Sequence, residues 1–249
     1  MSDEQRSRYG IATCSHYGKP DDFRLGLALE TIGLAKAAGI PFITTDSSSE
    51  DVQEILRAAG AVVIPGEGLT YGEKRRLALK YVLDDDMIAV IMEPEKSTLV
   101  PFLDDLVWAV VCGADMVIPW RRSMDSYPSY QKILEPYCNW QAHGLMGGDT
   151  MYDLWNGIRV VRAGLAAQAI LDYRGEYGTD FWDSMYVPVV QALHAGAKIA
   201  SVPIDYVHPA SQKEAEEGGA AMDKKRDAQR DTILKSIGDV CKDLGLTPA

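Results

Sequence analysis

The chain has few cysteines and no long apolar segment, and each shortage excludes a class of protein. Its cysteines, Cys14, Cys112, Cys138 and Cys241, are scattered and form no C-x-x-C pair, so neither a zinc site nor a disulfide framework is indicated. No stretch of the sequence approaches the ~20 apolar residues that a membrane-spanning helix needs. The first ten residues, MSDEQRSRYG, lack the apolar core of a secretion signal. We therefore expect a reduced, cytoplasmic protein.

Positive charge is also scarce. The sequence has 25 Lys and Arg residues against 36 Asp and Glu, which gives a formal net charge of −11. Because nucleic-acid affinity depends on clustered Lys and Arg, no nucleic-acid partner is expected, although a single phosphate group can still be bound locally. With 249 residues, 47% of them apolar, and neither an internal repeat nor a clear linker, we expect one domain over residues 1–249.

Apolar strand-like segments alternate with helix-like segments through the first half of the chain. Short strand and helix units in alternation predict a mostly parallel α/β sheet with helices on both faces, and strands that are apolar throughout fit a sheet buried on both sides. Residues 123–156 show no clear pattern. The predicted strands are residues 9–13, 41–45, 61–65, 88–92, 114–119, 158–162 and 198–206. The predicted helices run through residues 23–38, 52–59, 77–82, 99–110, 177–193 and 211–246, the last with a break at Gly218 and Gly219.

The most informative stretch is IAVIMEPEK, residues 88–96. Here a buried strand ends in two carboxylates and an ammonium, and Glu93 and Glu95 are two positions apart, so on an ideal strand they face the same side. Ligands of parallel α/β sheets bind beyond the carboxyl ends of the strands. The segments expected at that edge are loop 14–22, Asp46, loop 66–72, residues 93–96 and residues 120–122.

This arrangement resembles the GT-A fold glycosyltransferases, the group that includes dolichol-phosphate-mannose synthases and glucosyl-phosphoglycerate synthases. The resemblance covers residues 8–209 and implies a GT-A (Rossmann-like), mostly parallel central sheet. It divides the single domain into a nucleotide-binding half, residues 8–122, an acceptor-binding half, residues 123–209, and a C-terminal helical tail, residues 210–249. The motifs that carry it, in chain order, are ITTDSSSED, GEGLTYGEKRRLAL, IAVIMEPEK, GGDTMYDLWNGIRVVRAG, EYGTDFWDSMY and VPIDYVHP.

In the first half, the resemblance implies which residues bind the nucleotide. Asp46 stands where the family's strand-end Asp contacts the base and ribose. Gly66 and Gly68 lie in the Gly-rich turn that follows, and Lys74 lies at the basic helix start after it. From the residues alone other interpretations stay open: Asp46 as a helix cap, the glycines as shapers of a turn, and Lys74 as part of a solvated helix start.

At the end of the fourth predicted strand, Glu93 and Glu95 stand where the family has its Asp-x-Asp metal motif. His208 stands where a histidine often completes the metal and diphosphate site. The implied cofactor is Mg²⁺ or Mn²⁺, which as a Lewis acid neutralises the leaving diphosphate. The longer Glu side chains depart from the family pattern. A second way to neutralise the diphosphate uses cationic side chains, here those of Lys96, Arg121 and Arg122.

Asp180 follows Tyr177-Gly178-Thr179 at a predicted helix start, where a carboxylate is electrostatically favoured in any protein. The resemblance implies a catalytic role: a carboxylate here accepts the proton of the acceptor hydroxyl, or holds the donor sugar or the acceptor. Trp140, Tyr152 and Trp155 are candidate platforms for sugar faces, with core packing as the other interpretation for at least one of them.

The implied activity is transfer of a sugar from a nucleoside-diphosphate sugar to a hydroxyl acceptor, either a small hydrophilic molecule or a lipid phosphate. Two other functions stay open. One is a sugar nucleotidyltransferase; that class has a loop rich in Gly, Arg and Lys after the first strand, where this chain has SHYGKPDDF. The other is a nucleotide-sugar-binding protein without turnover. The sequence also leaves a homodimer open.

Overall fold

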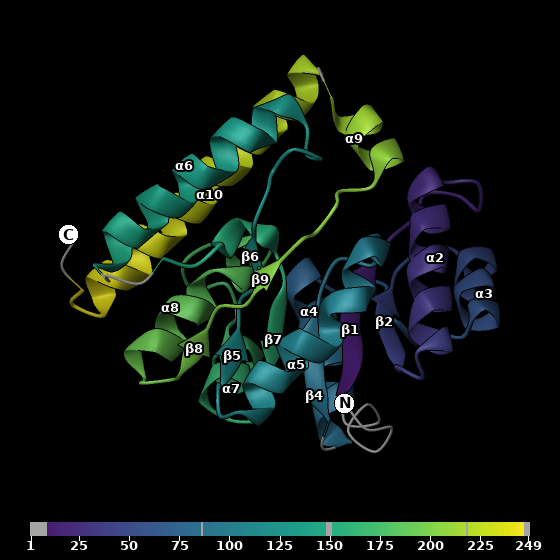
Figure 1. The fold of residues 1–249 in the computed structure, drawn as a ribbon, viewed down its shortest axis with the longest axis horizontal. Helices are drawn as coiled ribbons and strands as arrows, with labels where there is room; N and C mark the ends of the chain where they lie inside the picture. Colours follow the sequence, from purple (N-terminus) through teal and green to yellow (C-terminus); the bar gives the residue numbers. More distant parts are fainter. Residues whose placement is uncertain (1–8, 86, 148–150, 218, 247–249) are drawn as a thin grey trace.

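The computed structural model describes residues 9–85, 87–147, 151–217 and 219–246, and these form an α/β fold (Figure 1). The larger sheet has seven strands in the order β3-β2-β1-β4-β7-β5-β8, and a two-stranded sheet pairs β6 with β9. Within the larger sheet only β7 runs antiparallel, to β4 on one side and β5 on the other. The predicted fold class, α/β with a mostly parallel central sheet, is confirmed.

The element bounds follow the sequence pattern closely in the first half and less closely in the second. The strands are β1 Tyr9–Ser15, β2 Phe42–Asp46, β3 Val62–Pro65, β4 Ile88–Ile91, β5 Met116–Val117, β6 Trp120–Arg121, β7 Arg159–Val161, β8 Ile199–Ala200 and β9 Pro203–Ile204. The α-helices are α2 Phe23–Ala37, α3 Glu50–Ala59, α4 Tyr71–Asp84, α5 Leu103–Val111, α6 Ser129–Met146, α7 Leu165–Asp172, α8 Val187–His194, α9 Ala210–Glu216 and α10 Ala220–Asp243. The 3-10 helices are η1 Ser97–Phe102, η2 Leu154–Asn156 and η3 Asp183–Met185.

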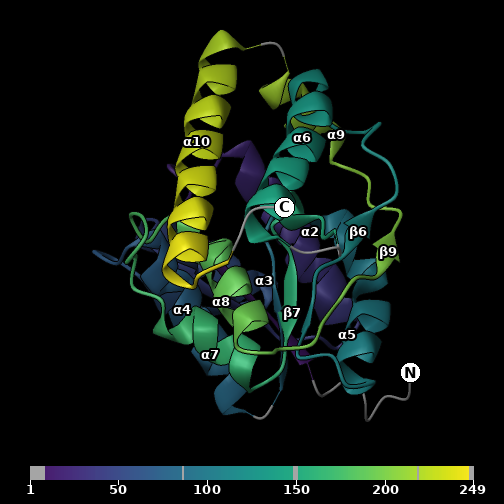
Figure 2. The same ribbon diagram turned by 90° about the vertical axis from the view of Figure 1, so that its left-hand side faces the viewer.

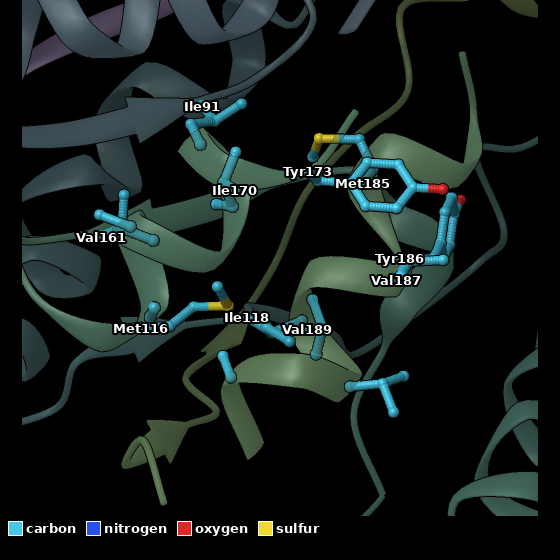
Figure 3. Close-up of a cluster of buried hydrophobic side chains, with 14 of the residues drawn as sticks. Ile91, Met116, Ile118, Val161, Ile170, Tyr173, Met185, Tyr186, Val187 and Val189 are labelled. Carbon is cyan, nitrogen blue, oxygen red and sulfur yellow. The ribbon is translucent and has the colours of Figure 1, made fainter. Parts of the chain in front are cut away.

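Two apolar clusters cover the two faces of the sheet. Side chains alternate between faces along a strand, so Ile11 of β1 and Val90 of β4 join one cluster, whereas Ala12 and Ile91 join the other. The first cluster packs under α2, α3 and α5. The second packs under α4, α7, α8 and the end of α10, and Figure 3 shows part of it. Burial on both faces leaves the carboxyl edge of the sheet as the place where polar side chains gather.

The helices α6 and α10 together form a helical arm above that edge. Figures 1 and 2 show α6 and α10 side by side. The two helices run parallel: Tyr130 at the start of α6 donates a hydrogen bond to Asp227, and Leu145 at its end lies against Gly238. The long α6 corrects the expectation that residues 123–156 are irregular. In the GGDTMYDLWNGIRVVRAG motif, residues 148–150 lie outside the described residues. Residues 1–8 and Gly218, elsewhere in the chain, also lie outside them.

Three predicted elements differ from the structure for local reasons. The helix expected over residues 99–110 begins as the 3-10 helix η1, which contains Pro101, before α5 follows. The helix expected from Tyr177 begins only at α8, after η3. The strand expected over residues 198–206 divides into β8 and β9, which belong to different sheets. No helix of the described residues combines the length and the apolar character that a bilayer crossing requires.

Candidate active site

The carboxyl ends of β1, β2 and β4 open into a cleft of about 780 Å³. Its walls come from the ends of these strands, the start of α4, residues 179–182 and Lys225 of α10. A second cavity, of about 300 Å³, lies beside it under the helical arm, and a small one of about 50 Å³ lies below both. Glu93 lines all three spaces, so the tip of β4 is the point at which they meet.

The two carboxylates at the tip of β4 each face a cation. Glu95 is buried, and its Oε1 lies 2.5 Å from Nη2 of Arg24 on α2. Glu93 is open to the cleft, with 41% of its side chain exposed, and its Oε2 lies 3.4 Å from Nζ of Lys96. The Lys96 ammonium is itself buried and donates to the carbonyl oxygen of Asn156 at 2.7 Å. Both residues line the cleft, Glu93 with an exposed side chain and Glu95 with a carboxylate that is buried against Arg24.

These surroundings separate the pKa values of the two carboxyls. Burial raises the pKa of Glu95 to about 7, and Glu93 adds to the effect while Arg24 opposes it. Burial also acts to raise the pKa of Glu93, but Lys96 and Arg226 overcome it and lower that pKa below its usual value. Glu93 therefore carries its charge at neutral pH, whereas Glu95 exchanges a proton near pH 7.

His208 lies in the wall of the second cavity, and neither of its ring nitrogens has a hydrogen-bond partner among the described residues. Its ring packs against Tyr127 with centroids 4.6 Å apart. Burial, together with the nearby charge of Lys96, lowers the pKa of His208 to about 4. His208 is therefore a neutral imidazole at physiological pH, which is the form that binds metals and hydroxyl groups.

This lowered pKa makes the stability depend on pH. Below pH 6.5 the His208 imidazole takes up a proton in the unfolded chain, whereas the folded chain resists it until about pH 4, so the free energy of unfolding falls as the pH falls. The loss between pH 7 and pH 5 is about 2 kcal/mol. We expect His208→Asn to remove this share of the pH dependence, measured by urea unfolding at both pH values.

The control for that measurement is His194→Asn, the same substitution at the exposed end of α8. Glu95 acts in the opposite sense, because the stability from its raised pKa is lost as the pH rises through about 7. Only the difference between wild type and variant therefore isolates His208. Equal pH dependence in the wild type and His208→Asn would contradict a buried, neutral His208.

Asp180 lies at the cleft, but not at a helix start. It precedes η3 with a left-handed backbone (φ 57°), unusual for a residue other than glycine. Its carboxylate accepts two hydrogen bonds from Arg76, at 2.6 and 2.7 Å, and one from Thr70 at 2.7 Å. Burial opposes the charge, but these bonds lower the pKa of Asp180. Gly72 is required here, because a Cβ at that position would lie 2.0 Å from Asp180 Oδ1.

On the nucleotide side, Asp46 shapes the walls of the cleft but does not line it. It is fully buried, and its carboxylate accepts from the hydroxyls of Ser15, at 2.6 Å, and Ser48, at 3.0 Å. The turn that this creates places Ser47 in the cleft, where Nζ of Lys74 donates to Ser47 Oγ at 2.5 Å. Of the four predicted residues on this side, Asp46, Gly66, Gly68 and Lys74, only Lys74 lines the cleft.

Gly66 and Gly68 act through the backbone. The Gly66 amide donates to the Asp46 carbonyl oxygen at 2.8 Å, and a Cβ on Gly66 would lie 2.8 Å from Cγ2 of Thr45. Gly68 has φ +76°, a conformation that glycine adopts at no steric cost. Both glycines therefore set the course of the loop that leads into α4.

Arg121 and Arg122, predicted together as diphosphate binders, have different surroundings. Arg121 is buried, and its guanidinium lies 2.6 Å from both Asp153 and Glu135. It borders the second cavity but not the larger cleft. Arg122 is exposed and pairs with Asp205 at the surface, away from both spaces. Arg121 therefore shares the second cavity with Glu93 at the tip of β4, whereas Arg122 lines neither space.

Several cations near the cleft were not singled out from the sequence. Arg24 reaches it from α2, and Lys225 and Arg226 reach the cavities from α10. A signal for the last two existed in the sequence MDKKRDAQR, a basic cluster in an otherwise acidic chain. Arg24 follows the Asp22 cap of α2 and carries no comparable signal.

Few side chains near the cleft could act as ligands of a metal ion. The described residues contain no group of three or more His, Cys, Asp and Glu side chains that converge on one point. Mg²⁺ and related ions that act with nucleotides commonly take one or two carboxylates, with substrate phosphates supplying further oxygens. Glu93, open to the cleft, with Glu95 beside it, meets that smaller requirement if Arg24 releases Glu95.

Comparison with known proteins gives a fold but no family. No protein-family model and no curated protein matches the chain. Among solved structures, it is similar to glucosyl-3-phosphoglycerate synthase from Mycobacterium tuberculosis in complex with phosphoglyceric acid, with a TM-score of 0.59 and 15% identity over 95% of this chain and 82% of that one. The same enzyme with Mn²⁺, UDP-glucose and phosphoglyceric acid gives a TM-score of 0.55, with 15% identity and the same coverage.

The chain is also similar to a synthetase that was solved with a bound nucleotide. CMP:2-keto-3-deoxy-manno-octonic acid synthetase complexed with CTP has a TM-score of 0.51 and 12% identity over 90% of this chain and 99% of that one. The chain spans half the length of the bifunctional IspDF from Campylobacter jejuni, which it also matches. The α/β sheet of the chain is thus arranged as in the glucosyl-3-phosphoglycerate synthase and the synthetase. More narrowly, the chain has a GT-A-like nucleotide-sugar transferase fold, and the resemblance inferred from its motifs is confirmed for the fold.

Proposed function

We propose that the chain is a glycosyltransferase that moves a sugar from a nucleoside-diphosphate sugar to a hydroxyl acceptor. The observation that carries the proposal is the position of Glu93, which lies where a cleft at the carboxyl edge of the sheet adjoins a second cavity under α6 and α10. A two-substrate transferase needs two adjoining spaces of this kind, with groups between them that neutralise the negative charge of the leaving diphosphate. The GT-A-like fold supports the same assignment.

The nucleotide-binding half, residues 8–122, supplies the donor site. The nucleoside would lie over the ends of β1 and β2, against His16, Ser47 and Lys74, which line the cleft. Asp46, Gly66 and Gly68 would hold the loops that form this surface, as their buried hydrogen bonds and backbone conformations support. The diphosphate would then extend toward the tip of β4, where Arg24 and Lys225 also face the cleft.

We assign Glu93 and Glu95 as the residues that would hold Mg²⁺ or Mn²⁺, with His208 as the third candidate. When bound, such an ion supplies Lewis-acid neutralisation of the leaving diphosphate. The lowered pKa of Glu93 keeps its carboxylate charged at neutral pH, as a cation ligand must be. Lys96, fixed beside Glu93, adds positive charge at the same place and supports the alternative in which side chains share the neutralisation.

The acceptor-binding half, residues 123–209, would close the site together with the helical tail, residues 210–249. Lys225, Arg226 and Gln229 of α10 line the cavities, which makes the tail part of the site. The predicted proton-accepting role of Asp180 would require its carboxylate to leave Arg76. The hydrogen bonds that lower its pKa support a positioning role instead, in which Asp180 fixes the loop carrying Phe181 and Trp182.

The test is calorimetric titration of the full chain with UDP, GDP and their sugars, with and without Mn²⁺, followed by assays of donor hydrolysis. Binding of a nucleotide sugar with slow release of sugar supports the proposal. No binding in any combination contradicts it. Release of pyrophosphate from a nucleoside triphosphate and a sugar phosphate would instead identify a nucleotidyltransferase. Nucleotide binding without transfer or hydrolysis would identify a binding protein.

A further inference from the structure

The cavity of about 300 Å³ under the helical arm has walls of unusual polarity. Its lining comes from the tip of β4, the loop before α6, and the faces of α6, α9 and α10 that point toward the sheet. Trp155 and Trp182 form part of the wall, and Arg24, Glu93 and Glu95 are shared with the donor cleft. A molecule in this cavity would therefore lie next to the reacting end of a donor in the cleft.

Most charges around the cavity are already paired with one another. Arg121 is held between Glu135 and Asp153. Glu216 of α9 accepts hydrogen bonds from Arg226, at 2.9 Å, and from the amide nitrogens of Gln131 and Gln212, at 3.0 and 3.1 Å. Charges compensated in this way have little attraction left for an anionic ligand, because Arg24, Lys96, Arg121 and Arg226 each already face a carboxylate. Among the cations that line the cavity within the described residues, Lys225 alone has no such partner, and it also lines the donor cleft.

Neutral polar atoms, in contrast, lack partners. The Tyr127 hydroxyl, Oε1 of both Gln131 and Gln212, and both ring nitrogens of His208 make no hydrogen bond within the described residues. Tyr127, Gln131 and His208 are 3%, 4% and 6% exposed. A buried polar group without a partner is destabilising, and nearly all such groups in proteins are paired with protein, water or ligand. Several unpaired neutral groups around one cavity indicate that it is built to bind something.

From this geometry we infer, on the basis of the proposed function, that the cavity holds the acceptor and that the acceptor is a neutral saccharide or glycoside. Hydroxyl groups both donate and accept, so they match a phenol, two amide oxygens and an imidazole better than a phosphate does. The two tryptophans offer apolar surface to the faces of a sugar ring. The volume lies at the lower end of the ~300–1,000 Å³ of small-molecule sites, which suits one or two sugar units.

The transfer step follows from the two adjoining spaces. The acceptor hydroxyl oxygen forms a bond to the anomeric carbon of the donor sugar. The bond from that carbon to the phosphate oxygen breaks, and the nucleoside diphosphate leaves with the bonding electron pair. The hydroxyl proton is released to solvent through the cleft. No oxidant or further reactant is needed.

The test is Tyr127→Phe, which removes the hydroxyl and keeps the ring that packs against Arg121 and His208, with urea unfolding of the variant measured alongside binding. Binding is followed by saturation-transfer NMR on the full chain without donor, so the readout does not require activity. The probes are the methyl glycosides of glucose, mannose and galactose, with maltose and cellobiose, against 3-phosphoglycerate and undecaprenyl phosphate in detergent micelles. We expect a neutral saccharide to bind, and Tyr127→Phe to weaken it by about tenfold, the effect of one lost hydrogen bond.

The matched control is Tyr137→Phe, the same change on the outward face of α6, where the ring is 50% exposed; it should bind the saccharide as the wild type does. The inference is overturned if only 3-phosphoglycerate or undecaprenyl phosphate binds, if neither class binds, or if the two variants behave alike. The proposed function fails separately, in the titrations with nucleotides and nucleotide sugars. Saccharide binding that Tyr127→Phe weakens would still support the saccharide site in that case.

Discussion

Glu93→Gln is expected to lower donor turnover by about 10²–10³-fold, the several kcal/mol that charge neutralisation at a leaving diphosphate contributes. Glutamine keeps the size of the side chain but removes the charge that faces Lys96 and the donor cleft. The fold should survive, because 41% of the Glu93 side chain is exposed to the cleft. The measurement is initial rate of sugar release or transfer at saturating donor, with urea unfolding of the same preparation.

Glu54→Gln is the matched control, since Glu54 lies on the exposed face of α3 and should retain full turnover. Glu95→Gln extends the test to the second carboxylate, whose charge faces Arg24. Donor turnover that survives both Glu93→Gln and Glu95→Gln would show that the tip of β4 does not hold a catalytic cation.

Arg121→Met is expected to lower the free energy of unfolding by about 3–5 kcal/mol, the usual loss when one partner of a buried ion pair is removed. Methionine replaces the apolar stem of Arg121 but leaves Glu135 and Asp153 buried without their shared cation. Burial already raises the pKa of Glu135, while burial of Asp153 is outweighed by Arg121, which lowers its pKa. Urea unfolding at pH 7 measures the difference.

The neighbouring residue provides the control. Arg122 lies one position along the chain, and its pair with Asp205 has side chains 55% and 64% exposed. Arg122→Met should therefore change stability by less than about 1 kcal/mol, because solvent screens an exposed ion pair. Equal losses for Arg121→Met and Arg122→Met would contradict a structural role for the buried cluster.

Most of the first half of the fold was predictable because its strands and helices have apolar faces. Helix α6 was not, for a physical reason. Its buried face mixes the apolar Leu134, Cys138 and Ala142 with the polar Gln131, Glu135, Asn139 and His143, while Ile133 and Trp140 point outward. The polar residues are bonded to Glu216, Arg121, Asp153 and backbone, so burial here follows hydrogen bonding as well as hydrophobicity. A search for apolar periodicity does not detect such a helix.

The candidate site was predictable only where chemistry coincides with the end of a strand. Glu93 and Glu95 follow β4 directly, and the structure turns both toward the cleft. Two of the cations that lower their pKa values, Arg24 and Arg226, come from helices distant in the sequence and are brought close only by packing. The engagement of Asp180 by Arg76 likewise depends on a loop conformation that no local pattern specifies.

The two halves of helix α10 are held to the rest of the protein by different kinds of contact. Its buried residues, Ile233, Ser236, Ile237, Val240 and Cys241, all lie in the second half. The first half, which supplies Lys225 and Arg226 to the site, is held by contacts such as Arg226 with Glu216 and Tyr130 with Asp227. Part-exposed ion pairs weaken with added salt, whereas apolar packing does not. The first half of α10 is therefore the section of this helix that added salt should loosen first, while its second half stays packed.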